Sequence, residues 1–313
     1  MTQPAGAASS ASPAVRLAAG FRALEPRVYR SVGGRELELD LHVPAGAPSG
    51  SGGPWPTFVF FHGGGWNIGS RESVSLHLLP WMERGWATVN VEYRLVRDAR
   101  APGAVWDARH AVRWVFDHAA DHGLDAARVV LGGFSSGGHL ALMAALGGPL
   151  PPEVGRNLGD AAPAKRPVDP RAGIPPTDGP PPRAAAVVSW FGISDVATLV
   201  QGERPRAFAR HWLGSRPDLL ELAHTLSPVE RIGPGTPPIV SVHGDRDPVV
   251  PFSQSERLHQ ALDRAGVPNR LHVVRGGGHG DWGADTWGRA YDAVFGFVEG
   301  QRAVTETCRE GGA

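Results

Sequence analysis

GGFSSGGHLAL, residues 132–142, is the stretch that decides how this sequence folds. It joins the short apolar run RVVL to an apolar segment with helix-forming residues, which is typical of a strand-to-helix turn. A serine displayed on such a turn needs small residues two positions before and after it, because a Cβ there would clash with the backbone. Ser135 meets this condition with Gly133 and Gly137, whereas Ser136 would have the bulky Phe134 at the earlier position. The stretch therefore predicts that Ser135 is a nucleophile.

The same glycine-rich turn has one alternative interpretation, a phosphate-binding loop at a helix N-terminus. Such loops carry the pattern G-x-x-x-x-G-K-[ST], which is absent here, and the loop itself contains no cationic residue. The nucleophile interpretation is therefore favoured.

The rest of the chain alternates strand patterns with helical patterns. Continuous apolar runs, typical of strands buried on both faces, occur at 57–61, 87–93, 128–134, 184–190, 237–244 and 270–276. Helical segments lie between or after them, at 72–85, 105–123, 137–148, 252–266 and 286–301. Residues 28–44 alternate apolar and polar side chains around Gly33-Gly34, which predicts an antiparallel hairpin. We expect an α/β fold with a mostly parallel central sheet, helices on both faces and an N-terminal antiparallel hairpin.

The domain organisation follows from composition. Residues 1–24 are rich in Ala, Ser and Pro, so we expect a disordered tail. Residues 25–301 are expected to form a single domain, and residues 302–313 a C-terminal tail. Residues 147–183 are dense in Pro and Gly and have no hydrophobic period, which predicts an insertion loop that is either functional or disordered.

Composition also excludes several functions. Basic and acidic residues number 31 each, so no charge excess indicates a nucleic acid or an acidic membrane surface as partner. Cys308 is the single cysteine, which rules out an intrachain disulfide and a cysteine-based metal site. The N-terminal residues lack the basic opening and apolar core of a signal peptide, and no apolar run is long enough to span a membrane. We expect a soluble cytoplasmic protein without metal; the sequence does not indicate an oligomeric state.

A serine hydroxyl needs a base and an orienting carboxylate, and both types of residue follow Ser135 in the chain. His279 lies in the glycine-rich loop of RGGGHGDW, directly after an expected strand. Asp245 and Asp247 both follow the strand that ends in VHG, and their positions alone leave the choice between them open.

HGGGW, residues 62–66, directly follows the buried run TFVFF. Consecutive glycines let backbone N–H groups approach a ligand closely, so this loop could stabilise an oxyanion. The N–H of Ser136, at the start of the expected helix, could add another donor. Four aromatic residues near these motifs are candidates for the walls of a substrate pocket, namely Trp66, Phe134, Trp190 and Trp282.

Taken in order, HGGGW, VEYRL, GFSSGGHLA, HGDRDPVVP and GGGHG resemble the α/β-hydrolase carboxylesterases. The likeness is greatest to acetyl- and feruloyl-type esterases with an HGGGW loop, which are related to hormone-sensitive-lipase-like esterases and arylformamidases, and it covers roughly residues 27–300. The resemblance implies Ser135 as nucleophile, His279 as base, Asp247 rather than Asp245 as acid, and Gly64, Gly65 and Ser136 as oxyanion donors. It implies that His62 and His139 are structural and that no cofactor is needed.

The chain departs from that family pattern in three places. Ser136 stands where Ala is usual, the insertion at 147–183 is unusual, and a helical N-terminal cap is missing. The function implied is a serine carboxylesterase acting on small-molecule or short-acyl esters. The alternatives are an arylformamidase-like amidohydrolase and, from another class, a catalytically inactive hydrolase fold that binds a ligand.

Overall fold

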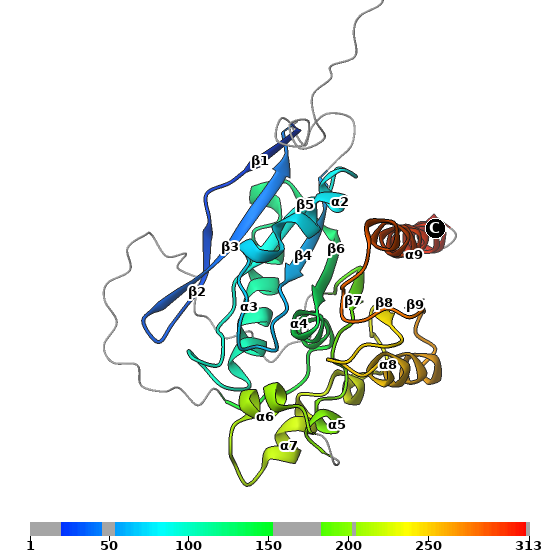
Figure 1. Ribbon diagram of the computed structural model, residues 1–313. Coiled ribbons are helices and arrows are strands. Elements are labelled where there is room, and N and C mark those ends of the chain that lie inside the picture. Colours follow the sequence, from blue (N-terminus) through cyan, green and yellow to red (C-terminus); the bar gives the residue numbers. More distant parts are fainter. Residues whose placement is uncertain (1–19, 46–53, 153–182, 202–204, 311–313) are drawn as a thin grey trace, which may run out of the picture.

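The computed structural model describes residues 20–45, 54–152, 183–201 and 205–310. One sheet runs through this part of the chain, with its strands in the order β1-β3-β5-β4-β6-β7-β8-β9 and β2 also paired to β3 (Figure 1). The strands are β1 (Phe21–Ala23), β2 (Arg27–Val32), β3 (Arg35–Pro44), β4 (Trp55–Phe61), β5 (Ala87–Val91), β6 (Leu124–Phe134), β7 (Ala186–Trp190), β8 (Ile239–Gly244) and β9 (Asn269–Val274).

Strands β5, β4, β6, β7, β8 and β9 are parallel to one another, while β1, β2 and β5 pair with β3 antiparallel. Parallel strands place all their carboxyl ends at one edge of the sheet, and loops at that edge can therefore form a common site. The predicted mostly parallel sheet and its N-terminal hairpin are confirmed.

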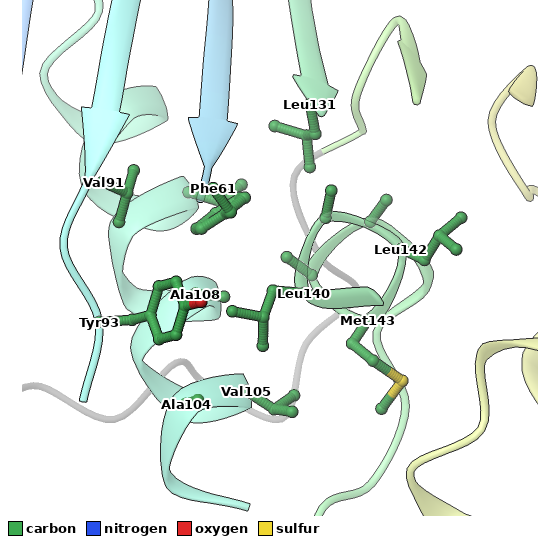
Figure 2. Packing of buried hydrophobic residues seen from close by; sticks show 14 of the residues in the cluster. Phe61, Val91, Tyr93, Ala104, Val105, Ala108, Leu131, Leu140, Leu142 and Met143 are labelled. Carbon is green, nitrogen blue, oxygen red and sulfur yellow. The ribbon is translucent and has the colours of Figure 1, made fainter. Parts of the chain in front are cut away.

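Helices cover both faces of the sheet. The helical segments are η1 (Glu72–Leu78), α2 (Leu79–Met82), α3 (Gly103–Asp117), η2 (Ala120–His122), α4 (Ser136–Leu146), α5 (Val196–Val200), α6 (Ala207–Leu213), α7 (Leu219–Thr225), η3 (Pro228–Arg231), α8 (Ser253–Arg264) and α9 (Ala284–Glu310). Alternate residues of a strand point to opposite faces, so Val59 and Phe61 pack toward α3 and α4, and Phe58 and Phe60 toward α2 and α9. Figure 2 shows Leu140 of α4 on the first of these faces, among side chains from β4, β5, β6 and α3.

Two sequence features determine the conformation of the N-terminal hairpin: the glycines of its turn and the alternating leucines of β3. Gly33 and Gly34 have φ values of 55° and 74°, the left-handed conformation that a tight two-residue turn requires. The alternating leucines of β3, such as Leu39, are fully buried because every second residue faces the core.

The termini of the domain differ from the expectation. Phe21–Ala23 form β1 by pairing with residues 42–44 of β3, so the end of the predicted tail 1–24 belongs to the sheet. Helix α9 continues to Glu310 through most of the predicted tail 302–313, and no proline interrupts it. Most of the predicted insertion 147–183 lies outside the described residues.

A buried ion cluster joins α3 to the edge of the sheet. The Asp107 side chain is completely buried, and the Arg94 guanidinium donates to both of its oxygens, Nε to Oδ2 at 2.8 Å and Nη2 to Oδ1 at 2.9 Å. The backbone N–H of Arg94 donates to Oδ2 at 3.0 Å, and the guanidinium of Arg30 from β2 also contacts Oδ1. One carboxylate thus fixes the hairpin, the segment after β5 and α3 relative to one another.

We predict that Asp107→Ala lowers the free energy of unfolding by about 3–5 kcal/mol, because it leaves two buried guanidinium groups without their carboxylate. Urea denaturation followed by circular dichroism measures this loss. Asp117→Ala on the same helix is the matched control, since its exposed pair with Arg113 should be worth about 1 kcal/mol or less. Equal losses in the two variants would contradict the role of the buried cluster.

Candidate active site

Ser135 lies on a sharp turn between β6 and α4. Its φ and ψ are 53° and −116°, a conformation that a residue with a side chain rarely adopts. The turn is held by the Ser135 N–H, which donates to the Trp190 carbonyl at 2.9 Å. A Cβ on Gly133 would lie 2.4 Å from the Gly137 carbonyl oxygen, and one on Gly137 would lie 2.1 Å from the Phe61 carbonyl oxygen. Only glycine fits at either position, which is the physical reason for the G-x-S-x-G pattern.

His279 and Asp247 are in direct contact. His279 Nδ1 donates to Asp247 Oδ2 at 2.5 Å, while Asp247 Oδ1 accepts the backbone N–H groups of Val249 at 2.8 Å and Val250 at 2.9 Å. Burial raises the pKa of the Asp247 carboxyl, but hydrogen bonds from His243, His279 and Val250 outweigh it and hold that pKa below its usual range. The carboxylate therefore stays ionised and oriented toward His279.

Asp245, the other candidate acid, turns away from His279. Its Oδ1 accepts the N–H of Gly276 at 2.6 Å, and its Oδ2 lies 3.4 Å from the guanidinium of Arg275. It braces the loop after β9, and the geometry places only Asp247 beside the imidazole.

Ser135, Asp247 and His279 follow the parallel strands β6, β8 and β9, so they share one edge of the sheet. Phe191 links the two loops: it follows Trp190, whose carbonyl accepts the Ser135 N–H, and its ring centroid is 4.6 Å from that of His279. Within the described residues no hydrogen bond joins Ser135 Oγ to His279. Such contacts are often long in enzymes without substrate and shorten when it binds.

The HGGGW loop lies beside the nucleophile. A Cβ on Gly63 would be 3.5 Å from the Ser135 Cβ, and Gly64 and Gly65 have φ values of 120° and 59°. In the described part of the chain no protein group accepts the N–H groups of Gly64 and Gly65. Ser136 is the first residue of α4, where a helical N–H has no partner in its own helix. These N–H groups are thus available to an anion next to Ser135.

His62 stabilises the conformation of this loop through contacts with Gly63 and Tyr93. Its Nδ1 lies 2.7 Å from the carbonyl oxygen of Gly63, and its ring stacks on Tyr93 at a centroid distance of 4.2 Å. The Tyr93 hydroxyl donates to the His62 carbonyl at 2.9 Å. Burial lowers the pKa of His62, so the ring stays neutral near pH 7, consistent with a structural role.

Trp66 and Trp190 were expected to line a substrate pocket, but both side chains are buried in the core. Trp66 is fully buried and stacks on Trp212 of α6 at 4.0 Å, with the ring of Phe208 from the same helix at 6.1 Å. Trp190 is 1% exposed and is covered by Phe134 and Trp287. Both indoles are core residues, because the loop and the strand that carry them turn their side chains inward.

His139, expected to be structural, also belongs to this core. Its ring meets the edges of Trp66 and Trp212 at 5.1 and 5.3 Å, and its Nε2 lies 2.8 Å from the Leu226 carbonyl oxygen. Burial lowers the pKa of His139 to about 4, so the buried imidazole is neutral.

The remaining candidates, Phe134 and Trp282, belong to a group of rings next to the nucleophile. This aromatic cluster consists of Phe134, Phe191, Trp282 and Trp287. Trp287 of α9 lies 4.7 Å from Trp282 and 5.8 Å from Phe134, and both tryptophans are half-buried. Sequence analysis missed Trp287; its signal was an aromatic residue in the first turn of a helix shortly after the His279 loop.

Among the described residues, no group of three His, Cys, Asp or Glu side chains is placed to hold a metal ion. The helices of that same part of the chain include none that is long and apolar enough to cross a membrane.

Known proteins resemble this chain over most of its length. Esterase LipQ of Mycobacterium tuberculosis is 30% identical over 258 residues, which cover 77% of this chain and 55% of LipQ. Esterase LipC of the same organism is 26% identical over 72% of this chain and 53% of LipC. The chain therefore spans about half the length of these curated relatives.

A solved structure, esterase Est2 of Thermogutta terrifontis, superimposes with a TM-score of 0.66 and 27% identity over 88% of this chain and 91% of Est2. The same esterase 2 phosphoramylated by tabun gives a TM-score of 0.65, 26% identity and coverage of 89% and 94%. Together with the sheet order, these likenesses identify the fold as the α/β-hydrolase fold, which confirms the prediction. The BD-FAE family model matches residues 39–262, and the chain belongs to that family.

Proposed function

We propose that this chain is a serine carboxylesterase that hydrolyses small-molecule esters. The observation that carries the proposal is the Asp247–His279 hydrogen bond at the sheet edge where the strained turn displays Ser135 beside the HGGGW loop. A carboxylate that orients a histidine next to a serine is the arrangement that activates a hydroxyl for attack. The esterase names of LipQ, LipC and Est2 support the same function.

The reaction has two acyl-transfer steps. His279 Nε2 takes the proton of Ser135 as Oγ forms a bond to the ester carbonyl carbon, and the carbonyl electron pair moves to oxygen. When the intermediate collapses, the bond to the alcohol oxygen breaks and His279 gives its proton to the leaving alcohol. Water then repeats the sequence on the acyl-enzyme and releases the acid. Asp247 holds the imidazole in one tautomer and stabilises its positive charge.

The oxyanion is assigned to the N–H groups of Gly64, Gly65 and Ser136. Each such donor typically lowers the barrier by about 3–4 kcal/mol, because it is already oriented before charge develops. The side chain of Ser136 is not needed for this role, since only its N–H would take part.

The aromatic cluster favours ester substrates that carry a small group or a planar aromatic group. Phe191 contacts His279, and the half-buried Trp282 and Trp287 lie beside Phe191, so a substrate bound at Ser135 would meet this cluster. An arylformamidase-like amidohydrolase would use the same residues, and turnover of p-nitrophenyl acetate against N-formylkynurenine distinguishes the two functions.

We predict that Ser135→Ala lowers kcat for p-nitrophenyl acetate by at least about 10³-fold, because the nucleophile is lost. Ser136→Ala is the matched control and should change kcat by less than about threefold, because its N–H remains. Mass mapping of a fluorophosphonate adduct should find the label on Ser135. Loss of activity in the Ser136 variant alone would overturn the assignment.

We predict that Asp247→Asn lowers kcat by roughly 10³–10⁴-fold, since an amide cannot stabilise the imidazolium and favours the wrong tautomer. Asp245→Asn is the neighbouring control, and its effect should be smaller than about fivefold, because Asp245 does not contact His279 and its partner Arg275 is exposed to solvent. Steady-state kinetics of both variants measure the difference, and similar small losses would point to another acid.

We predict that Trp287→Ala raises KM for phenyl acetate by roughly 2- to 10-fold, the equivalent of about 0.5–1.5 kcal/mol of lost ring contact. KM for ethyl acetate should change little, because it carries no ring. Trp106→Ala is the control: this half-buried indole of α3 donates to the Pro151 carbonyl and is not part of the aromatic cluster. Equal changes in KM for both esters would exclude ring recognition by Trp287.

A further inference from the structure

His243, the next-to-last residue of β8, is a second imidazole in contact with the Asp247 carboxylate. Its side chain is completely buried. Nε2 lies 3.2 Å from Asp247 Oδ2 and 3.0 Å from the Val250 carbonyl oxygen, and Nδ1 lies 2.7 Å from Ser255 Oγ on α8. The mechanism above does not use this imidazole.

The contacts of His243 determine which nitrogen carries hydrogen. Nε2 faces a carbonyl and a carboxylate, which are both acceptors, so Nε2 must carry the N–H. Nδ1 faces only the Ser255 hydroxyl, which can donate, so a neutral ring accepts there. Ser255 is itself 2% exposed, and this hydroxyl therefore selects the tautomer whose Nε2–H is shared between the Val250 carbonyl and Asp247.

Two histidines thus use the same carboxylate oxygen. Asp247 Oδ2 faces His279 Nδ1 at 2.5 Å and His243 Nε2 at 3.2 Å, while Oδ1 accepts the N–H groups of Val249 and Val250. With donors on both oxygens, the carboxylate cannot rotate without losing at least one hydrogen bond. A donor that shares Oδ2 also withdraws negative charge from the oxygen that faces His279.

We propose that His243 is a positioning residue for the catalytic base: it fixes the Asp247 carboxylate and tunes how strongly that carboxylate stabilises the His279 imidazolium, with Ser255 setting its tautomer. The proposal rests on the proposed function, in which Asp247 and His279 belong to the active site. A continuous series of polar contacts then runs from His279 through Asp247 and His243 to Ser255 on α8.

The other charged groups nearby face elsewhere. Asp245 on the same loop bonds to Gly276 and Arg275. Arg257 on α8 lies 3.8 Å from Asp195, the residue that caps α5. The remaining ring against His243 is Phe252, which is apolar and meets it edge-on at 5.7 Å.

The test compares His243→Leu with His243→Gln in the full-length protein, using p-nitrophenyl acetate from pH 5 to 9. His243→Leu should lower kcat roughly tenfold or more with little change in KM, as expected for loss of an outer hydrogen-bond partner. Its acid limb in kcat/KM should move to higher pH, because a carboxylate with one donor fewer holds the imidazolium more strongly. His243→Gln should recover most of kcat and of the pH profile, since its amide N–H can reach the same oxygen.

Ser255→Ala provides a second variant that removes one buried hydroxyl and tests the tautomer directly. It should lower kcat by a smaller factor and move the acid limb in the same direction as His243→Leu. Ser253→Ala, at the exposed start of the same helix, is the matched control and should match the wild type. The Nδ1 proton of His279, observed by NMR, should shift in His243→Leu and not in Ser253→Ala.

A wild-type kcat and pH profile in folded His243→Leu and Ser255→Ala would overturn the proposal and leave the proposed function intact. A loss of kcat with an unmoved acid limb and no recovery in His243→Gln would also overturn it, because that pattern indicates packing alone. Failure of the proposed function itself has a different signature: the wild type turns over no ester, and Ser135 takes no fluorophosphonate label.

Discussion

The active site depends on the close approach of two backbone segments, the turn after β6 and the end of β4. Gly137 meets the carbonyl oxygens of Phe61 and His62 so closely that a Cβ would lie 2.1 and 2.4 Å from them. This approach brings the start of α4, with the N–H of Ser136, against the beginning of the HGGGW loop. The strained φ of Ser135 is the local cost, which the parallel sheet on either side offsets by fixing both segments.

The two sides of the candidate site, the Asp247–His279 pair and the HGGGW loop, are held in place by different interactions. The carboxylate side consists of loops that follow β8 and β9, joined by the short hydrogen bond between Asp247 and His279. The oxyanion side is part of the hydrophobic core, since Trp66 stacks on Trp212 and His62 stacks on Tyr93. Polar contacts therefore position His279, and apolar packing positions the HGGGW loop.

Much of this arrangement could be predicted from the sequence, because the decisive features are local. The turn at Ser135, the hairpin at Gly33-Gly34 and the strand runs each follow from residue types within a few positions. Trp66 was assigned to the site from its place beside the loop, but the direction of its side chain depends on α6, about 140 residues later in the chain. Trp287 and His243 were missed for the same reason: their roles arise from partners that only the fold brings close.

The short helix α6 lies outside the sheet, yet it contacts the HGGGW loop of the candidate site. Its Phe208 lies against Gly65 and its Trp212 stacks on Trp66, so the docking of α6 helps to hold the HGGGW loop in shape. Short helices outside a sheet open locally at a lower free energy than the strands do. We therefore expect α6 to undock on heating before the sheet unfolds. Substitutions that stabilise the docked α6, although distant in sequence from Ser135, should then preserve the shape of the HGGGW loop at higher temperature.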